Sequence, residues 1–448
     1  MDFNTFKQAV IKAAEEQKIA EYELYFQAAE STSVSAYKHE TDKFTSSTEG
    51  GVCFRCIVNG KMGYASTENL DPAGAGSLVA RAAANAAVLE AEEPVFLSEG
   101  GQTYEPLEFT PYSLPTTGAL IEKVLDTQEK LYAADARVID GCMTQGFAEQ
   151  NEIAIYNSKG LDLHYANHAS GLMVAAVVTD GKEMANDHQI KLGELSTLDT
   201  EAMAKKSAAT AVRKLGGDVA PTAVCPVVFD PDAMSDLLAT FSSVFSAETA
   251  QKGLSRLGDK EGQTIASPIV TLVDDPFYKD SPMPINFDAE GSPAHRKNVI
   301  ENGVLQTLLY NLKTAAVAGK TTTGNASKAG YDAPVEVRPF TMYLAPGKMS
   351  EEELLKKAGN GVYINSLGGL HAGANPITGD FSLQSAGFLI ENGEKTKAVK
   401  SFTVAGNFYD LLQKITAVAD NLELPGAMGS TAFGSPSVMV ETLSIAGK

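Results

Sequence analysis

Short turns between alternating strand patterns constrain this fold more than any other feature of the sequence. Asn-Gly pairs stand at 59–60, 302–303 and 392–393, and Ser-Lys-Gly forms a further turn at 158–160. Asn-Gly readily supplies the left-handed residues of the tight turn that joins neighbouring antiparallel strands. Such hairpins outnumber any pattern typical of a parallel βαβ unit. The sequence therefore predicts an α+β fold built on antiparallel sheets.

The pattern divides the chain into three parts, as expected for 448 residues, which exceed what one core normally supports. We predict an N-terminal α+β domain at 1–95 and a middle α+β region at 110–218 that packs with the first. A break rich in Gly, Pro and small residues at 216–226 introduces a β-rich C-terminal domain at 222–448.

Two helix starts are marked by a capping aspartate followed by proline at the first helical position. Asp71 and Pro72 predict the start of a long helix that extends to about Glu92. Asp230 and Pro231 predict a second start, directly after a buried strand pattern.

Charge and hydropathy exclude several classes of function. The chain has 56 Asp and Glu against 36 Lys and Arg, a net charge of −20, and its basic residues form no stripe. Because such a surface repels phosphate backbones and anionic lipid, we expect no direct nucleic-acid binding. No apolar run approaches the length of a membrane span, and no basic start precedes an apolar segment. We therefore expect a cytoplasmic protein without a membrane partner.

Cysteine and histidine spacings do not indicate a metal or redox site. Cys53 and Cys56 are three apart in a strand pattern, so their side chains point to opposite faces and are expected to be buried structural thiols. His164 and His168 also lie in a strand-like segment, where four residues span about 13 Å, too far for one metal ion. The sequence contains neither an H-E-x-x-H nor a G-x-S-x-G motif, and no G-x-G-x-x-G follows a strand pattern.

Polar loops of the third part supply the candidate binding residues. The segment 368–394 is dense in Gly, Asn and Asp, which is typical of backbone in unusual conformations, and 287–305 and 324–334 are similar. Binding residues concentrate in such loops when sheets carry them. The alternative, that these side chains cap turns and bind loop amides, stays open for each residue. The substrate-binding candidates are Asp288, Glu290, Arg296, Asn325, His371, Asn375, Thr378, Asp380 and Ser382.

Several long motifs in a fixed order resemble the TldD/PmbA family, and within it the branch called PmbA or TldE. In the first part the resemblance rests on GGVCFRCIVNGKMGYASTENL and the alanine-rich segment after it. In the third part it rests on VVFDP, LVDDP, FDAEGSPAHRKNVIENGVL, TTTGNA, GGLHAGANPITGDFSLQSAGFLIENGE and GSPSVMVETLSIAGK. The chain departs from the branch at His371, where a Gly-x-Gly-x-Asn run is expected.

The resemblance implies one subunit of a cytosolic two-subunit peptidase that acts on unfolded or extended peptides. The TldD-type subunit carries H-E-x-x-x-H on a helix of its C-terminal domain and is similar to zinc metallopeptidases. The PmbA-type subunit shares the fold and lacks these ligands. The matching helix here, 231–251, contains no histidine, and H-E-x-x-x-H occurs nowhere in the chain. We therefore expect no metal and no catalytic residue in this chain, with zinc in a TldD-type partner.

Two functions remain open, and with them whether the chain is itself an enzyme. In the first, it is a non-catalytic subunit that shapes a cavity and holds an extended peptide by strand addition. In the second, it is a stand-alone homodimeric peptidase or peptide-binding protein, with a metal site improvised from His371, Asp380 and their neighbours. Since the family is associated with control of DNA gyrase, indirect modulation of gyrase is a third and less favoured function.

Overall fold

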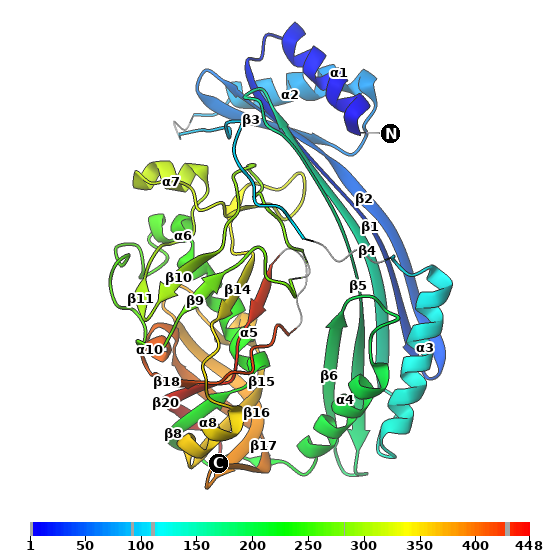
Figure 1. The fold of residues 1–448 in the computed structure, drawn as a ribbon, viewed down its shortest axis with the longest axis vertical. Helices are drawn as coiled ribbons and strands as arrows, with labels where there is room; N and C mark the ends of the chain where they lie inside the picture. The colour runs from blue at the N-terminus through cyan, green and yellow to red at the C-terminus, as the bar shows by residue number, and fades with distance from the viewer. Residues whose placement is uncertain (1–2, 91–93, 109–112, 282, 426–430) are drawn as a thin grey trace.

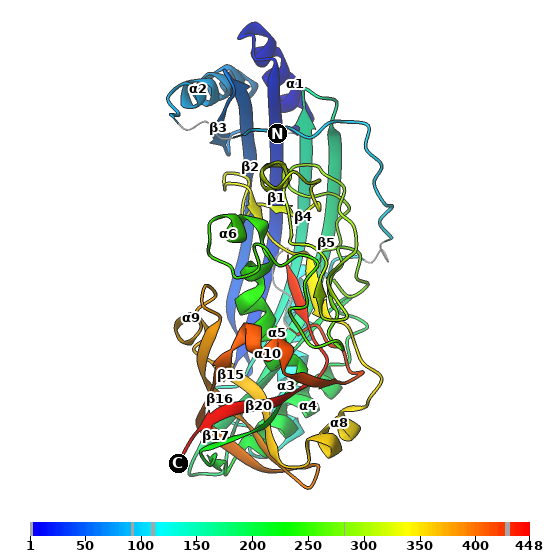
Figure 2. The same cartoon turned by 90° about the vertical axis from the view of Figure 1, so that its left-hand side faces the viewer.

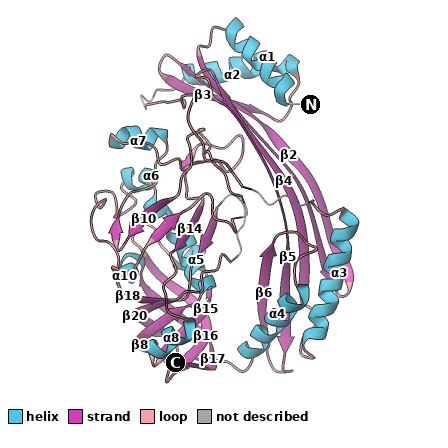
Figure 3. Ribbon diagram, in the orientation of Figure 1, coloured by secondary structure: helices cyan, strands magenta, loops and turns pink. Residues whose placement is uncertain are grey.

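A long curved sheet and the C-terminal domain on its concave side make up the molecule (Figure 1). The computed structural model describes residues 3–90, 94–108, 113–281, 283–425 and 431–448. No helix among these residues is long and apolar enough to cross a membrane. Antiparallel sheets with flanking helices dominate both parts (Figure 3), which confirms the predicted α+β fold.

The first sheet has six strands in the order β3-β2-β1-β4-β5-β6, and all its pairings are antiparallel. Strands from 1–95 and from 110–218 thus join in one sheet, which runs most of the length of the molecule (Figure 2). The predicted turn between β2 and β3 is present, with positive φ at Asn59 and Gly60. The strands are β1 (Glu21–Tyr37), β2 (Glu40–Val58), β3 (Lys61–Thr67), β4 (Met143–Asn157), β5 (Asp162–Thr179) and β6 (Met184–Leu192).

One face of this sheet is covered by helices at its two ends (Figure 3). At one end Leu24 and Phe54 pack with α1 (Phe3–Glu16) and α2 (Ala75–Ala87). At the other end, side chains such as Val34 pack with two further helices. These helices are α3 (Thr117–Ala134) and α4 (Thr200–Lys214). Side chains alternate along a strand, so the even-numbered residues of β1, β2 and β4 supply this face.

The odd-numbered residues of β1, β2 and β4 face the C-terminal domain. Tyr25, Cys53 and Ile153 pack there in one apolar cluster with Ile285 and Phe287. Cys56, three residues after Cys53, is buried in the cluster beneath α1 and α2. The prediction that the two thiols are buried and point to opposite faces is therefore confirmed.

The C-terminal domain packs two sheets around helix α5 (Pro231–Phe241). Its seven-stranded sheet has the order β18-β20-β8-β15-β16-β17-β7, and its five-stranded sheet the order β11-β10-β9-β14-β19. The first contains β7 (Asp218–Val219), β8 (Ala223–Phe229), β15 (Gly361–Gly368), β16 (Asp380–Glu391), β17 (Glu394–Asn407), β18 (Ile415–Val418) and β20 (Val438–Ala446). The second contains β9 (Leu272–Asp274), β10 (Lys297–Glu301), β11 (Val304–Leu305), β14 (Thr341–Leu344) and β19 (Ala432–Gly434).

Short elements complete the domain and carry its loops. The short strands β12 (Ala326–Ser327) and β13 (Glu336–Val337) pair with each other as a separate two-stranded sheet. The short helices are α6 (Ala247–Gln251), α7 (Leu312–Ala318), α8 (Glu351–Ala358), α9 (Leu370–Gly373) and α10 (Phe408–Gln413).

Two helices differ from the sequence prediction. The chain after Asp71 forms a 3-10 turn at Pro72–Gly74 and then α2, which ends at Ala87. The predicted end at Glu92 lies outside the described residues.

The segment 231–251 is not one helix. It is broken after α5 by a 3-10 turn and restarts as α6, whose cap is Ser246. The break follows from backbone pairing with Leu309. The Leu309 carbonyl accepts from the Ala247 N–H at 2.9 Å, and the Leu309 N–H donates to the Phe245 carbonyl at 2.9 Å.

Replacing Phe241 of α5 with Ala should destabilise the C-terminal domain by about 3–5 kcal/mol. Phe241 is fully buried, and its ring stacks on Phe408 with centroids 4.6 Å apart, so the substitution opens a cavity in the core. Phe44→Ala is the control, because Phe44 is 52% exposed and should change stability by less than about 0.5 kcal/mol. Urea unfolding followed by circular dichroism measures both, and equal losses would contradict the assigned core.

Candidate functional site

A cavity of about 700 Å³ lies between the concave face of the long sheet and the loops of the C-terminal domain. Its sheet wall includes both apolar and amide or hydroxyl side chains, because the middle of the strands is polar in sequence. The opposite wall comes from 283–289, 326–329 and 338–340. Examples from the sheet wall are Gln27, Ser33, Gln145, Phe147, Asn151 and Met173.

At one end of the cavity a buried ion network joins the sheet to the C-terminal domain. Arg55 of β2 donates from Nε to Glu23 Oε1 of β1 at 2.7 Å. Its Nη1 lies 3.7 Å from Oε1 of Glu290, which belongs to a loop of the C-terminal domain. All three side chains are at most 6% exposed, so water screens their charges weakly.

Asp288 organises the loop that carries Glu290. Its Oδ1 accepts from the N–H groups of Glu290 and Ser292, and its Oδ2 accepts from the N–H of Ala326, each at 2.9 Å. Gly291, with φ of +76°, allows the tight turn between them. Burial, together with the charge of Glu290, raises the pKa of Asp288 to about 7. Asp288 therefore holds backbone in place and has no oxygen left without a partner.

Glu290 also has partners for its carboxylate within the protein. Its Oε2 accepts from the N–H of Leu312 at the start of α7, at 2.9 Å. Burial raises the pKa of Glu290, and the charge of Arg55 opposes this effect.

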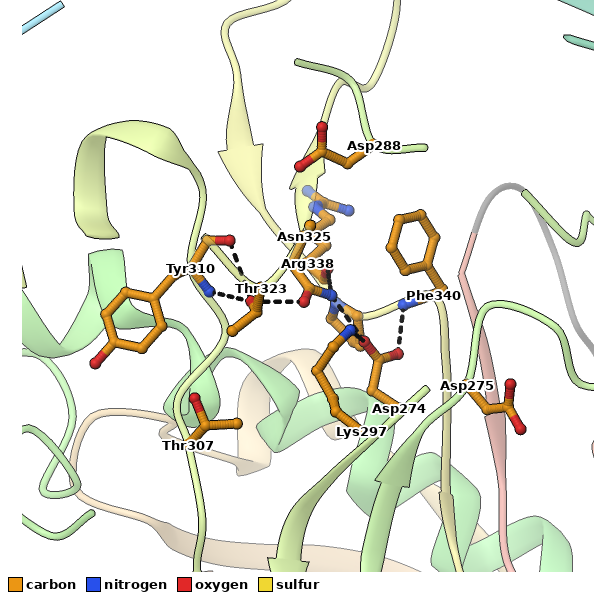
Figure 4. A network of polar contacts seen from close by, with 12 residues as sticks. Asp274, Asp275, Asp288, Lys297, Thr307, Tyr310, Thr323, Asn325, Arg338 and Phe340 are labelled. Atoms are coloured by element: carbon orange, nitrogen blue, oxygen red, sulfur yellow. Dashed lines mark hydrogen bonds and ion pairs between the residues drawn. The ribbon is translucent and has the colours of Figure 1, made fainter. Parts of the chain in front are cut away.

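Asp274 forms a second buried network next to Asp288 (Figure 4). Its Oδ2 lies 3.1 Å from Lys297 Nζ and accepts from Asn325 Nδ2 at 2.7 Å, and its Oδ1 accepts from the Phe340 N–H at 2.8 Å. Asn325 also donates to the Arg338 carbonyl at 3.0 Å. The network thus positions the 338–340 wall of the cavity.

Asp288 lines the cavity, whereas the other eight candidates are not among the described residues that line it. Arg296 is half-exposed, with its Nε 3.5 Å from Asp275 Oδ2. His371 lies exposed on the short helix α9, and Ser382 is exposed on β16. The structure therefore brings Asp288, Glu290 and Asn325 close together, and it places Arg296, His371 and Ser382 elsewhere.

Asn375, Thr378 and Asp380 build a loop beside β16. Asn375 Oδ1 accepts from the N–H groups of Ile377 and Thr378, and Thr378 Oγ1 accepts from the Asp380 N–H. Asn407 donates to Asp380 Oδ1 at 2.8 Å, and this hydrogen bond lowers the pKa of Asp380. Their polar groups satisfy the turn, as the alternative reading of these residues expects.

Two residues of the buried ion network, Glu23 and Arg55, were absent from the sequence candidates. Glu23 and Arg55 interrupt otherwise apolar strand segments, which was the signal available for them. Lys328 lines the cavity, with its Nζ 4.4 Å from the centre of the Tyr25 ring and 2.7 Å from the Tyr331 carbonyl.

No group of three or more His, Cys, Asp or Glu within the described part of the chain could hold a metal ion. Helix α5 presents Asp232 and Asp236 on its exposed side and contains no histidine.

Family models for PmbA/TldA metallopeptidases match three segments of the chain: domain 1 at 22–86, the central domain at 111–215 and the C-terminal domain at 222–447. The chain belongs to the PmbA/TldD family. A Methanothermobacter thermautotrophicus relative named as a metalloprotease is 27% identical over 411 residues, which are 89% of each chain.

Two solved structures of similar proteins have the same fold. A Thermotoga maritima protein described as a candidate modulator of a DNA gyrase has a TM-score of 0.90 and 31% identity, over 99% of this chain and 100% of that chain. TldE from Thermococcus kodakarensis has a TM-score of 0.88 and 24% identity, over 98% of this chain and 99% of that chain. The second supports the fold alone.

In this family member, Arg55→Met should cost about 3–5 kcal/mol of stability, because it leaves Glu23 and Glu290 buried without their cation. Arg137→Met is the matched control, since Arg137 pairs with Asp135 at the surface and should move the urea midpoint little. Urea titration of both variants measures the difference. If the urea midpoint of Arg55→Met shifts no more than that of the control, the network does not stabilise the fold.

Because of Asp288, the free energy of unfolding should fall as pH rises from about 4 to about 7 and should then level off. Its pKa is raised from an ordinary value of 3.8 to about 7, so the folded state binds more protons than the unfolded chain in this window. Asp288→Asn should make that slope shallower, whereas Asp259→Asn, at a side chain 81% exposed, should leave it unchanged. Urea midpoints between pH 4.5 and 8 test this, and an unaltered slope in Asp288→Asn would refute it.

Proposed function

We propose that this chain is the non-catalytic, PmbA/TldE-like subunit of a cytosolic zinc metallopeptidase system, and that its cavity holds an extended peptide. The cavity between sheet and loops carries this proposal. Its volume of about 700 Å³ lies within the range of ligand-binding pockets. Its sheet wall contains both apolar and hydrogen-bonding side chains, which suits peptide side chains and amides together.

The residues of this chain do not fit the zinc site that the family description implies. The segment 231–251 has no histidine, and the described residues hold no cluster of three metal-binding side chains. We therefore derive no catalytic step here and assign zinc and the general base to a TldD-type partner.

The free edge of β2, one strand away from the part of β1 that lines the cavity, supports strand addition by a peptide. Strand β3 pairs with β2 only over Val52–Val58, so in the described sheet 40–50 has a partner strand on one side alone. The neighbouring side chains Ser31 and Ser33 of β1 line the cavity, and the Ser31 and Ser47 hydroxyls are 2.8 Å apart. An extended peptide bound here would continue the sheet through backbone hydrogen bonds.

Metal analysis and peptide cleavage separate this function from that of a stand-alone enzyme. We expect the purified chain to hold no stoichiometric zinc and to cleave no peptide, and the mixture with a TldD-type partner to cleave extended peptides. Stoichiometric zinc with chelator-sensitive cleavage by the chain alone would favour the homodimeric peptidase. Size-exclusion chromatography with light scattering shows whether the chain pairs with itself or with the partner.

Placing a large side chain in the cavity should weaken peptide binding without unfolding the chain. Ala169 of β5 lines the cavity, so Ala169→Trp should lower peptide affinity at least tenfold. Ala166→Trp is the matched control, since Ala166 is exposed on the opposite face of the same strand and should bind peptide normally. Fluorescence anisotropy with a labelled extended peptide measures both. Equal affinities in the two variants would place the peptide outside the cavity.

A further inference from the structure

Lys328 brings a positive charge into the cavity wall without an ion-pair partner among the described residues. Its Nζ donates to the Tyr331 carbonyl at 2.7 Å and lies 4.4 Å from the centre of the Tyr25 ring. No carboxylate of the described chain lies within 4.0 Å of it. Burial lowers the pKa of Lys328, since water no longer fully solvates its ammonium group.

The other buried cations of this interface are neutralised. Arg55 has Glu23 at 2.7 Å, and Lys297 has Asp274 at 3.1 Å. Arg338 also lines the cavity, but its guanidinium pairs with Glu336 at 2.8 Å. Lys328 differs from these cations because no described carboxylate lies within 4.0 Å of it, and Glu23 and Asp332 act on its charge only from a greater distance.

Asp288 and Glu149 are the acidic residues among the described residues that line the cavity, and neither forms an ion pair with Lys328. Asp288 lines the same cavity, but both its oxygens accept backbone hydrogen bonds. An ammonium with unused donors in a partly desolvated cavity gains most from an anionic ligand, because a charge-assisted hydrogen bond replaces its lost hydration.

Gln27 offers a complementary group two residues along β1 from Tyr25. It lines the cavity, and its Oε1 is buried with no hydrogen-bond partner among the described residues. Buried acceptors are nearly always satisfied, so an unsatisfied one in a cavity indicates a donor that arrives with a ligand. A peptide N–H is such a donor. Beside it, Ile153 and Ile285 form an apolar wall for a side chain.

We propose that Lys328 binds a carboxylate of the peptide in the cavity, while Gln27 accepts one of its backbone N–H groups. The carboxylate is either the peptide's C-terminus or an acidic side chain. This inference rests on the proposed function, and it narrows the substrate class to extended peptides that present a carboxylate next to an apolar residue.

Three peptides of matched length test the proposal on the full chain. One, of Ala and Phe, has a free C-terminal carboxylate; the second is amidated and carries one Asp beside the Phe; the third is amidated and neutral. We expect at least one charged peptide to bind about tenfold more tightly than the neutral amide in calorimetry at pH 7, which corresponds to about 1.4 kcal/mol. Which charged peptide binds more tightly identifies the source of the carboxylate.

Variants assign the effect to the two residues. Lys328→Met should remove the preference for the charged peptide, and Lys328→Arg should keep it. Lys279→Met, at a surface lysine 82% exposed, should behave as the unaltered chain. Gln27→Leu should weaken the binding of all three peptides alike, because each peptide presents the same backbone N–H groups. Thermal melts confirm that each variant is folded.

The outcomes separate this inference from the proposed function. If all three peptides bind equally and Lys328→Met changes nothing, the carboxylate site is wrong while peptide binding stands. If none of the three binds, both are overturned. A preference that persists in Lys328→Met would place the carboxylate on another residue and also overturn the inference.

Discussion

The placement of the C-terminal domain against the sheet depends on Arg55, held between Glu23 and Glu290. Three charges with almost no exposure are costly to bury, and the attraction of Arg55 for the two carboxylates offsets that cost only when all three are in register. Two of them belong to paired strands and the third to a loop that Asp288 shapes. The network therefore favours one docking of the domain, and the cavity wall follows from that docking.

The cavity itself follows from the length of the strands. A strand of 17 residues such as β1 spans about 55 Å, more than one helix pair can cover. Helices cover one face at its two ends, and the C-terminal domain packs against the opposite face at one end. Between them the strand is polar, as at Gln27, Ser31 and Ser33, because that stretch faces a solvated cavity on the concave side.

Local features could be predicted from the sequence, whereas the grouping of distant residues could not. Local features depend on a few neighbouring residues. Examples are the hairpin at Asn59, the helix cap at Asp230 and the opposed thiols of Cys53 and Cys56. The break at Ser246 depends on pairing with Leu309, 63 positions further along the sequence, so helical periodicity could not show it. Strand pairing decides such contacts, and it leaves no local signal.

The candidate residues show why chemistry inferred from residue type is ambiguous. Asp288 lines the cavity, and Glu290 and Asn325 belong to the buried networks next to it, yet their oxygens and amides are largely used to fix backbone and neighbouring charges. Lys328 and Gln27 both line the cavity, and each has bonding capacity left over. In a buried polar interface the satisfied groups set the shape, and the unsatisfied ones are available to a ligand. Ligand-binding residues in this chain are therefore better identified by their unsatisfied hydrogen-bonding groups than by their residue type.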